Sequence, residues 1–205
     1  MIENELKLWG NVSTNQCQLA MMDLPIEIRS RLINLNGHDF SHTEINMPIV
    51  TVIIETPRNT AGKYVFDPAN QCYKLKKILP LGMYFPYDFG MIENTAAEDG
   101  DPADAMVITE CVTYPGVRLL CRIIGSLRAE QKKNGISIRN DRFFVVPADS
   151  VVFEHIKEIR DFSRQHNQQL QDFFINYMKA ENKKLSGLKY LNASNAEKTL
   201  QKLLK

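Results

Sequence analysis

Three aspartates within six residues, Asp99, Asp101 and Asp104, form the part of this chain best suited to chemistry. Carboxylates this close together repel one another and need a positive partner. A hard divalent cation such as Mg²⁺ binds a few carboxylates and keeps several of its waters. Gly100 permits a tight backbone path, and Pro102 stiffens the turn. The pattern predicts a metal-binding loop, although Asp, Gly and Pro are also ordinary residues of an acidic surface turn.

Strand-like segments flank this loop and would hold it in place. Residues 49–54 are all β-branched, and the apolar residues 105–108 follow the acids directly. The other predicted strands are 64–67 and 72–77 (a hairpin), 106–109, 117–124 and 142–146. Residues 79–90, rich in aromatic residues, Pro and Gly, are expected to form an ordered loop. Short strands separated by turn residues favour a barrel or a sandwich.

The C-terminal part of the chain shows helical periodicity. Apolar residues recur with i, i+3, i+4, i+7 spacing at Leu170, Phe173, Phe174 and Tyr177. This spacing predicts an amphipathic helix, with Ser163 as its N-cap. A second helix is predicted to begin with a capping box at residues 194–197. The lysines near the end of the chain are expected to solvate these helices, and they do not form a recognisable nucleic-acid reader.

Composition points to a soluble globular protein. The chain has 205 residues, 44% of them hydrophobic, and a formal net charge of +1, so no overall field favours nucleic acid or a membrane. Its apolar runs are too short to span a bilayer. The four cysteines form no CxxC pair, and no secretory leader is visible, so a cytoplasmic location is expected.

The predicted domain organisation is an N-terminal extension at residues 1–45, followed by one domain at residues 46–205. Within the extension, residues 24–32 could form a short helix after a proline. His38 and His42 stand four residues apart, as helical metal ligands do. Their polar, Gly-containing surroundings favour a surface loop instead.

Five motifs follow one another in a fixed order: residues 54–64, 83–90, 99–104, 139–147 and 173–177. They resemble the E-I-P…K-Y-E hairpin, the YPxxYG loop, the DGDPxD signature, the strand ending in Val-Pro and the F-F-x-x-Y helix of the soluble family I inorganic pyrophosphatases. The resemblance covers about Pro48 to Lys184. It implies a mainly β fold with flanking helices (α+β), namely a five-stranded OB-like β-barrel with C-terminal helices.

The resemblance also implies roles for individual residues. Metal binding falls to Asp99, Asp101, Asp104 and Asn140; catalysis to Asp101 and Glu55; phosphate binding to Lys63, Lys77, Arg142 and Tyr177. It implies Mg²⁺ as cofactor, hydrolysis of pyrophosphate to two phosphates by a metal-activated water, and a homo-oligomer, a hexamer by resemblance. Read without the family, the two lysines could be solvated strand ends and the tyrosine a plain core residue.

The outer part of the expected site departs from the family pattern. Neutral or altered side chains stand at Val65, Lys77, Phe85, Phe89, Gln131, Asn140 and Met178. Asn140 replaces a metal-binding aspartate, although Asp141 is adjacent and a small register shift could use it. An amide binds a hard cation more weakly than a carboxylate does. We therefore expect hydrolysis slower than the family norm. The alternatives are a homologue repurposed to bind a phosphorylated ligand or a partner, or a hydrolase of another phosphoanhydride.

Overall fold

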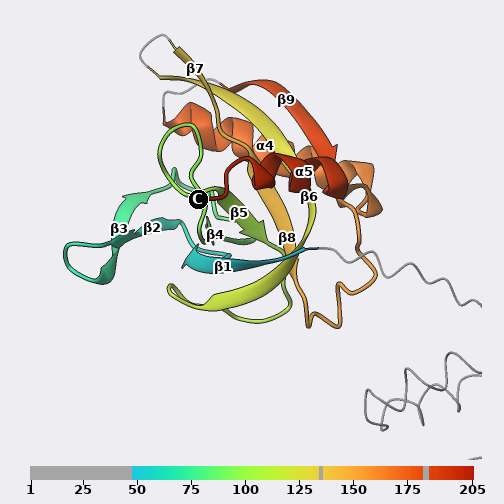
Figure 1. Cartoon of the computed structure of the whole chain (residues 1–205). Coiled ribbons are helices and arrows are strands. Elements are labelled where there is room, and N and C mark those ends of the chain that lie inside the picture. The colour runs from blue at the N-terminus through green and yellow to red at the C-terminus, as the bar shows by residue number, and fades with distance from the viewer. Residues whose placement is uncertain (1–47, 134–135, 182–184) are drawn as a thin grey trace, which may run out of the picture. The chain divides into compact units, whose positions relative to one another are not determined.

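The computed structural model of the protein describes residues 48–205, except 134–135 and 182–184 and the side chains of 131–137 and 185 (Figure 1). The expected N-terminal extension, its short helix and the His38–His42 pair lie outside the described residues, and the domain boundary stays a prediction. No helix in the described part of the chain is long and apolar enough to cross a membrane.

Five strands close into a barrel. In order around the barrel they are β1 (Ile49–Thr56), β4 (Asp88–Ile92), β5 (Asp104–Val107), β8 (Arg142–Pro147) and β6 (Arg118–Lys133), and β6 pairs back onto β1. Only the β5–β8 pair in this ring is parallel. Gly90 of β4 lies so close to β1 that a Cβ there would fall 2.1 Å from the carbonyl oxygen of Ile53. The predicted five-stranded barrel is confirmed.

Additional strands extend the barrel. Two of them, β7 (Ile136–Arg139) and β9 (Leu185–Asn192), pair with β6. A separate hairpin of β2 (Gly62–Asp67) and β3 (Cys72–Ile78) projects to one side (Figure 1). This hairpin was predicted, whereas β7 and β9 were not. Strand β4 begins within the segment that was expected to be an aromatic loop. The prediction missed it because the strand begins with Asp-Phe-Gly, which does not show a strand pattern.

Two hydrophobic clusters share the barrel strands. Along β8, Phe143 and Val145 belong to one cluster while Phe144 and Val146 belong to the other, as the two-residue period of a strand requires. The first cluster is covered by α5 (Ala193–Gln201) and the second by α4 (Arg164–Ala180), which begins soon after a short 3₁₀ turn, η2 (Ile159–Asp161). The predicted C-terminal helices are therefore confirmed.

The N-caps of the two helices differ in how well the sequence predicted them. Ser163 caps α4, accepting a hydrogen bond at 3.1 Å from the backbone N–H of His166, as predicted. The predicted capping box at Ser194 is wrong. Strand β9 runs directly into α5, and the side chain of Asn192 accepts a hydrogen bond at 3.0 Å from the N–H of Asn195. Asparagine is as good an N-cap as serine, and it comes two residues earlier.

Candidate active site

The acidic turn is held in shape by its own backbone. The N–H of Ala97 donates to the carbonyl of Asp101 at 2.8 Å, and the N–H of Gly100 donates to that of Ala97 at 3.0 Å. Gly100 has φ +90°, which glycine adopts without a Cβ clash. Strand β5 begins at Asp104 and anchors the far end of the turn. The Asp101 side chain is therefore presented to solvent on a braced loop.

Beside this turn lies a polar pocket of about 150 Å³. It brings together acids from the turn and cations from the hairpin and the barrel. Its lining residues are Lys63, Lys76, Asp99, Asp101, Pro102, Asp104, Asn140, Arg142, Tyr177, Met178 and Glu181. Seven of the nine predicted site residues are among them. The other two, Glu55 and Lys77, lie nearby but outside the lining that the described residues form.

Parallel pairing of β5 with β8 places Arg142 directly beside Asp104. The guanidinium Nη2 lies 3.5 Å from Asp104 Oδ2, and the Arg142 side chain is only 6% exposed. Its Nη1 also donates to the carbonyl of Asn140. These contacts fix the charge of Arg142 at the inner wall of the pocket.

Asn140 and Asp141, adjacent in the chain, have different partners. The Asn140 amide Nδ2 donates to Asp99 Oδ2 at 2.7 Å. Asp141, with a side chain 2% exposed, is held by Arg139: Nε donates to Oδ1 at 2.9 Å and Nη2 to Oδ2 at 2.5 Å. A register shift that would bring Asp141 into the pocket is thus not what the structure shows.

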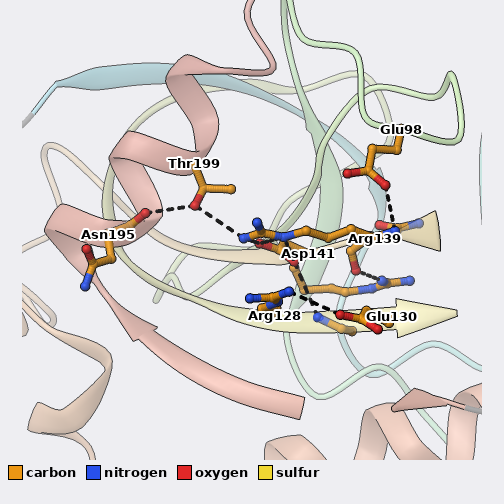
Figure 2. Close-up of polar contacts among 10 residues, drawn as sticks. Glu98, Arg128, Glu130, Arg139, Asp141, Asn195 and Thr199 are labelled. Atoms are coloured by element: carbon orange, nitrogen blue, oxygen red, sulfur yellow. Dashed lines mark hydrogen bonds and ion pairs between the residues drawn. The ribbon is translucent and has the colours of Figure 1, made fainter. Parts of the chain in front are cut away.

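Figure 2 shows the network around Arg139, the residue that precedes Asn140 of the pocket lining. Glu98, from the acidic turn, accepts the backbone N–H of Arg139 at 2.9 Å. Arg139 Nη2 donates to Thr199 Oγ1 at 3.4 Å, and Thr199 in turn donates to the carbonyl of Asn195 on α5 at 2.9 Å. Through these bonds, the turn that carries the acids is tied to β7 and α5.

Tyr177 on α4 forms the opposite wall. It is 6% exposed, and its hydroxyl has no hydrogen-bond partner among the described residues. The Lys63 ammonium lies 5.7 Å from the Tyr177 ring centroid and 5.1 Å from that of Phe89. Burial lowers the pKa of Lys63, but Tyr177, Asp104 and Glu55 outweigh burial and hold that pKa above its usual value. Lys63 is therefore a charged, largely desolvated donor that interacts with the Tyr177 hydroxyl.

The remaining predicted residues lie behind this wall. Lys77 sits 4.0 Å from the centroid of the Tyr177 ring and forms an ion pair with Glu181. Glu55 is half-buried at the end of β1, and burial raises its pKa despite the opposing charge of Lys63. The rings of Phe85 and Phe89 are buried in the core cluster that also contains Tyr177. The side chain of Gln131 lies outside the described part of the protein.

Sequence reasoning missed two charged residues of the pocket, Lys76 and Glu181. Glu181 follows Tyr177 by four residues, the spacing of one helix face, so the predicted helix could have pointed to it. Lys76 gave a weaker signal. It neighbours Lys77 on a strand, where successive side chains point to opposite faces, and the sequence did not show which lysine faces the acids.

The donor set fits a hard cation. Asp99, Asp101 and Asp104 supply carboxylate oxygens to one solvent-accessible pocket, and these are the ligands that Mg²⁺ takes in small number alongside water. Across residues 48–205 as far as they are described, no group of three His, Cys, Asp or Glu side chains is placed to hold a metal ion together. The geometry thus fits an ion held by one or two carboxylates and several waters rather than a closed protein cage.

Comparison with known proteins agrees with this geometry. The family model for inorganic pyrophosphatase matches residues 52–205. The chain is 36% identical over 136 residues to an inorganic pyrophosphatase of Thermus thermophilus, covering 66% of this chain and 75% of the relative. It is 32% identical over 155 residues to one of Streptomyces coelicolor, covering 75% and 93%.

Solved structures give the same answer. The crystal structure of inorganic pyrophosphatase from Thermus thermophilus superposes with a TM-score of 0.68 at 30% identity, covering 75% of this chain and 87% of that one. The inorganic pyrophosphatase from Coxiella burnetii gives 0.69 at 26% identity, covering 77% and 94%. The extent of the family match, the identity to these relatives and the shared barrel show that the chain belongs to the family I inorganic pyrophosphatases.

Proposed function

We propose that this protein hydrolyses inorganic pyrophosphate to two phosphates with Mg²⁺ as cofactor. One observation carries the proposal: a single pocket brings the carboxylates of Asp99, Asp101 and Asp104 together with the cationic side chains of Lys63 and Arg142. Carboxylate oxygens suit a hard divalent cation, and fixed cationic donors suit phosphate oxygens. The same pocket would therefore hold the metal and neutralise the phosphates.

The cationic wall would bind and orient the substrate. Lys63 donates from a site that keeps it charged, and Arg142 presents a fixed guanidinium suited to phosphate oxygens. Tyr177, which also lines the pocket, would add a hydroxyl donor. These three residues would hold one phosphoryl group while the other points towards the acids.

The acidic wall would handle the attacking water. Asp101 is exposed in the pocket, where it can accept a proton from water as a general base. Asp99 and Asp104 would hold the cofactor. Asn140 would either contribute its uncharged carbonyl oxygen or lie beside the metal through its amide group. Bound Mg²⁺ would lower the pKa of water and neutralise charge on the phosphates.

The test is release of phosphate from pyrophosphate by purified protein, with ATP and tripolyphosphate as comparison substrates. We expect release with Mg²⁺ and pyrophosphate, and none when EDTA removes the metal. Release no higher than in buffer, at high protein concentration and with several divalent metals, would overturn the proposal. Faster cleavage of ATP or tripolyphosphate would assign the pocket to another phosphoanhydride.

The proposal extends to the assembly and location of the protein. We expect a cytoplasmic homo-oligomer, a hexamer in line with the family resemblance described above. Light scattering coupled to size-exclusion chromatography measures the mass of the assembly directly, and a monomeric mass would remove the hexamer from the proposal.

A further inference from the structure

The Lys77–Glu181 ion pair stands at the edge of the pocket. The Lys77 side chain is 26% exposed and that of Glu181 20% exposed, so both are largely withdrawn from solvent. Glu181 lines the pocket, whereas in the described structure Lys77 lies behind it, against the face of the Tyr177 ring. Of this ion pair, Glu181 belongs to the pocket lining, while the Lys77 ammonium lies against the ring of Tyr177, another lining residue.

The negative charge of Glu181 is unfavourable at its position, the C-terminal end of a helix. It is the C-cap of α4, and its backbone N–H bonds to the carbonyls of Lys179 and Met178. Any residue other than proline could supply that N–H. A negative side chain at a helix C-terminus is disfavoured by the helix dipole. Helix stability therefore does not account for a carboxylate at this position.

An acid also works against the proposed chemistry. The pocket already contains Asp99, Asp101 and Asp104 on its acidic wall, and Glu181 adds a fourth carboxylate beside the cations. A bound phosphate group would be repelled by it and attracted by Lys77. Glu181 and a phosphate oxygen are thus alternative anionic partners for one ammonium.

We propose that Glu181 sets the affinity of the pocket for its anionic substrate by competing for Lys77. In the free protein the carboxylate holds Lys77 on the Tyr177 ring, and a phosphoryl group must displace it to recruit the lysine. This inference rests on the proposed function, because it assigns a role at the same pocket. It adds a residue that weakens binding, and it makes Lys77 a cation that the ligand must recruit.

The experiment measures binding of inorganic phosphate and of pyrophosphate by calorimetry, in EDTA so that hydrolysis does not proceed. We expect Glu181→Gln to bind both anions about tenfold more tightly, since it removes one charge near the ligand and releases Lys77. Glu181→Ala is measured beside it, because alanine removes both the charge and the acceptor oxygens that Glu181 offers to the lysine. Asp172→Asn is the control: it removes the same charge from an exposed position on the same helix and should leave binding unchanged.

A double-mutant cycle with Lys77→Met tests whether Glu181 acts through the lysine. If it does, most of the gain from Glu181→Gln disappears in the Lys77→Met background. An equal gain in both backgrounds would mean that Glu181 acts by charge alone, and the competition would be refuted. Weaker binding by Glu181→Gln would show that Glu181 positions Lys77 for the ligand, which also overturns the proposal.

The outcomes separate this inference from the proposed function. If the native protein hydrolyses pyrophosphate but Glu181→Gln binds as the native protein does, only the role of Glu181 fails. If Glu181→Gln binds phosphate more tightly while the native protein hydrolyses nothing, the role stands and the function fails. If neither protein binds either anion in EDTA, the role of Glu181 is overturned, while the function is decided by phosphate release with Mg²⁺.

Discussion

The acidic pocket and the Arg139 network both include residues of the same acidic turn, but their charged groups have different partners. In the network, Asp141 receives the Arg139 guanidinium through both carboxylate oxygens, and Thr199 takes a further N–H. In the pocket, the Asp101 side chain is exposed, and Tyr177 presents a buried hydroxyl without a hydrogen-bond partner in the described structure. Groups that the protein itself satisfies serve the fold. Groups left open are available to a ligand.

Two neighbouring residues mark the boundary between these regions. Asp141 carries a full charge and is used inside the protein, while Asn140, which is neutral, faces the pocket and bonds to Asp99. An aspartate signature in the sequence therefore does not reveal which carboxylates remain available. The partners decide this, and each region can be tested by changing the partners.

The largest expected effect is on catalytic activity and concerns the pocket. Asp101→Asn removes the proposed proton acceptor and should lower phosphate release at least about a hundredfold, the size typical of a lost general base. Asp149→Asn, at an exposed position beyond β8, removes the same charge and should retain activity. Both variants should unfold at the temperature of the native protein. Retained hydrolysis in Asp101→Asn would remove this residue as the base.

In the Arg139 network, the expected loss is in the stability of the fold. Arg139→Met leaves the buried Asp141 carboxylate without its cation and should lower the free energy of unfolding by about 2 kcal/mol, less than for a fully buried pair because Arg139 is 32% exposed. Arg118→Met is the control. Its ion pair with Glu93 spans 2.7 Å, but Arg118 is 68% exposed, so a loss below about 0.5 kcal/mol is expected. Equal losses in urea unfolding would erase the distinction between the regions.

Local signals in the sequence predicted several strands and the acidic turn, whereas the five-stranded barrel was implied by the family resemblance. The β-branched run at residues 49–54 and the alternating hairpin are patterns that strand geometry requires. Strand β4 left no such signal, since Gly90 is needed there for close contact with β1 and supplies no apolar side chain. Strands β7 and β9 are held by pairing with the long β6, a contact between distant segments that no local window contains.

Knowledge of the pocket from sequence was limited in the same way. The spacing of Asp99, Asp101 and Asp104 placed the acids on one turn, and the structure brings all three to one pocket. The partners of Asp141 and Lys77 could not be read from spacing. Arg139 is close to Asp141 in sequence, but the sequence does not show which way the Arg139 side chain points. Glu181 lies 104 residues from Lys77. Their roles follow only from the three-dimensional contacts.

A third prediction adds one negative charge at Asn140, where the pocket meets the Arg139 network. Asn140→Asp places a carboxylate against Asp99, so the metal-free protein should unfold at a lower temperature because like charges repel. The added acid should tighten Mg²⁺ binding by about tenfold, measured by calorimetry without substrate. Asn176→Asp, exposed on α4, adds the same charge elsewhere and should do neither. Unchanged Mg²⁺ affinity in Asn140→Asp would separate this residue from the metal-binding role implied by resemblance.

The smallest expected effect concerns Glu110, a hydrogen-bonded carboxylate that is not part of the pocket lining. It accepts hydrogen bonds from the Ser150 hydroxyl at 2.8 Å and from the N–H of Val151 at 3.0 Å. Its own backbone amide and then the Ser150 hydroxyl lower its pKa from an ordinary 4.5 to about 2. The folded protein thus binds this proton less readily than the unfolded chain does. The stability from Glu110 is fully present above about pH 4.5 and is lost as the pH falls towards 2.

Glu110→Gln should therefore destabilise the protein at pH 6 and make a smaller difference at pH 3, in urea unfolding followed by circular dichroism. The glutamine keeps an acceptor oxygen for Ser150 but no charge, so the part that changes with pH is the part that the ionised carboxylate supplies. Glu154→Gln, exposed four residues beyond Ser150, provides the matched loss of charge. A destabilisation by Glu110→Gln that is equal at both pH values would mean that its hydrogen bonds, and not its charge, hold this loop. An ionised carboxylate would then contribute to stability only in the Arg139 network and not at Glu110.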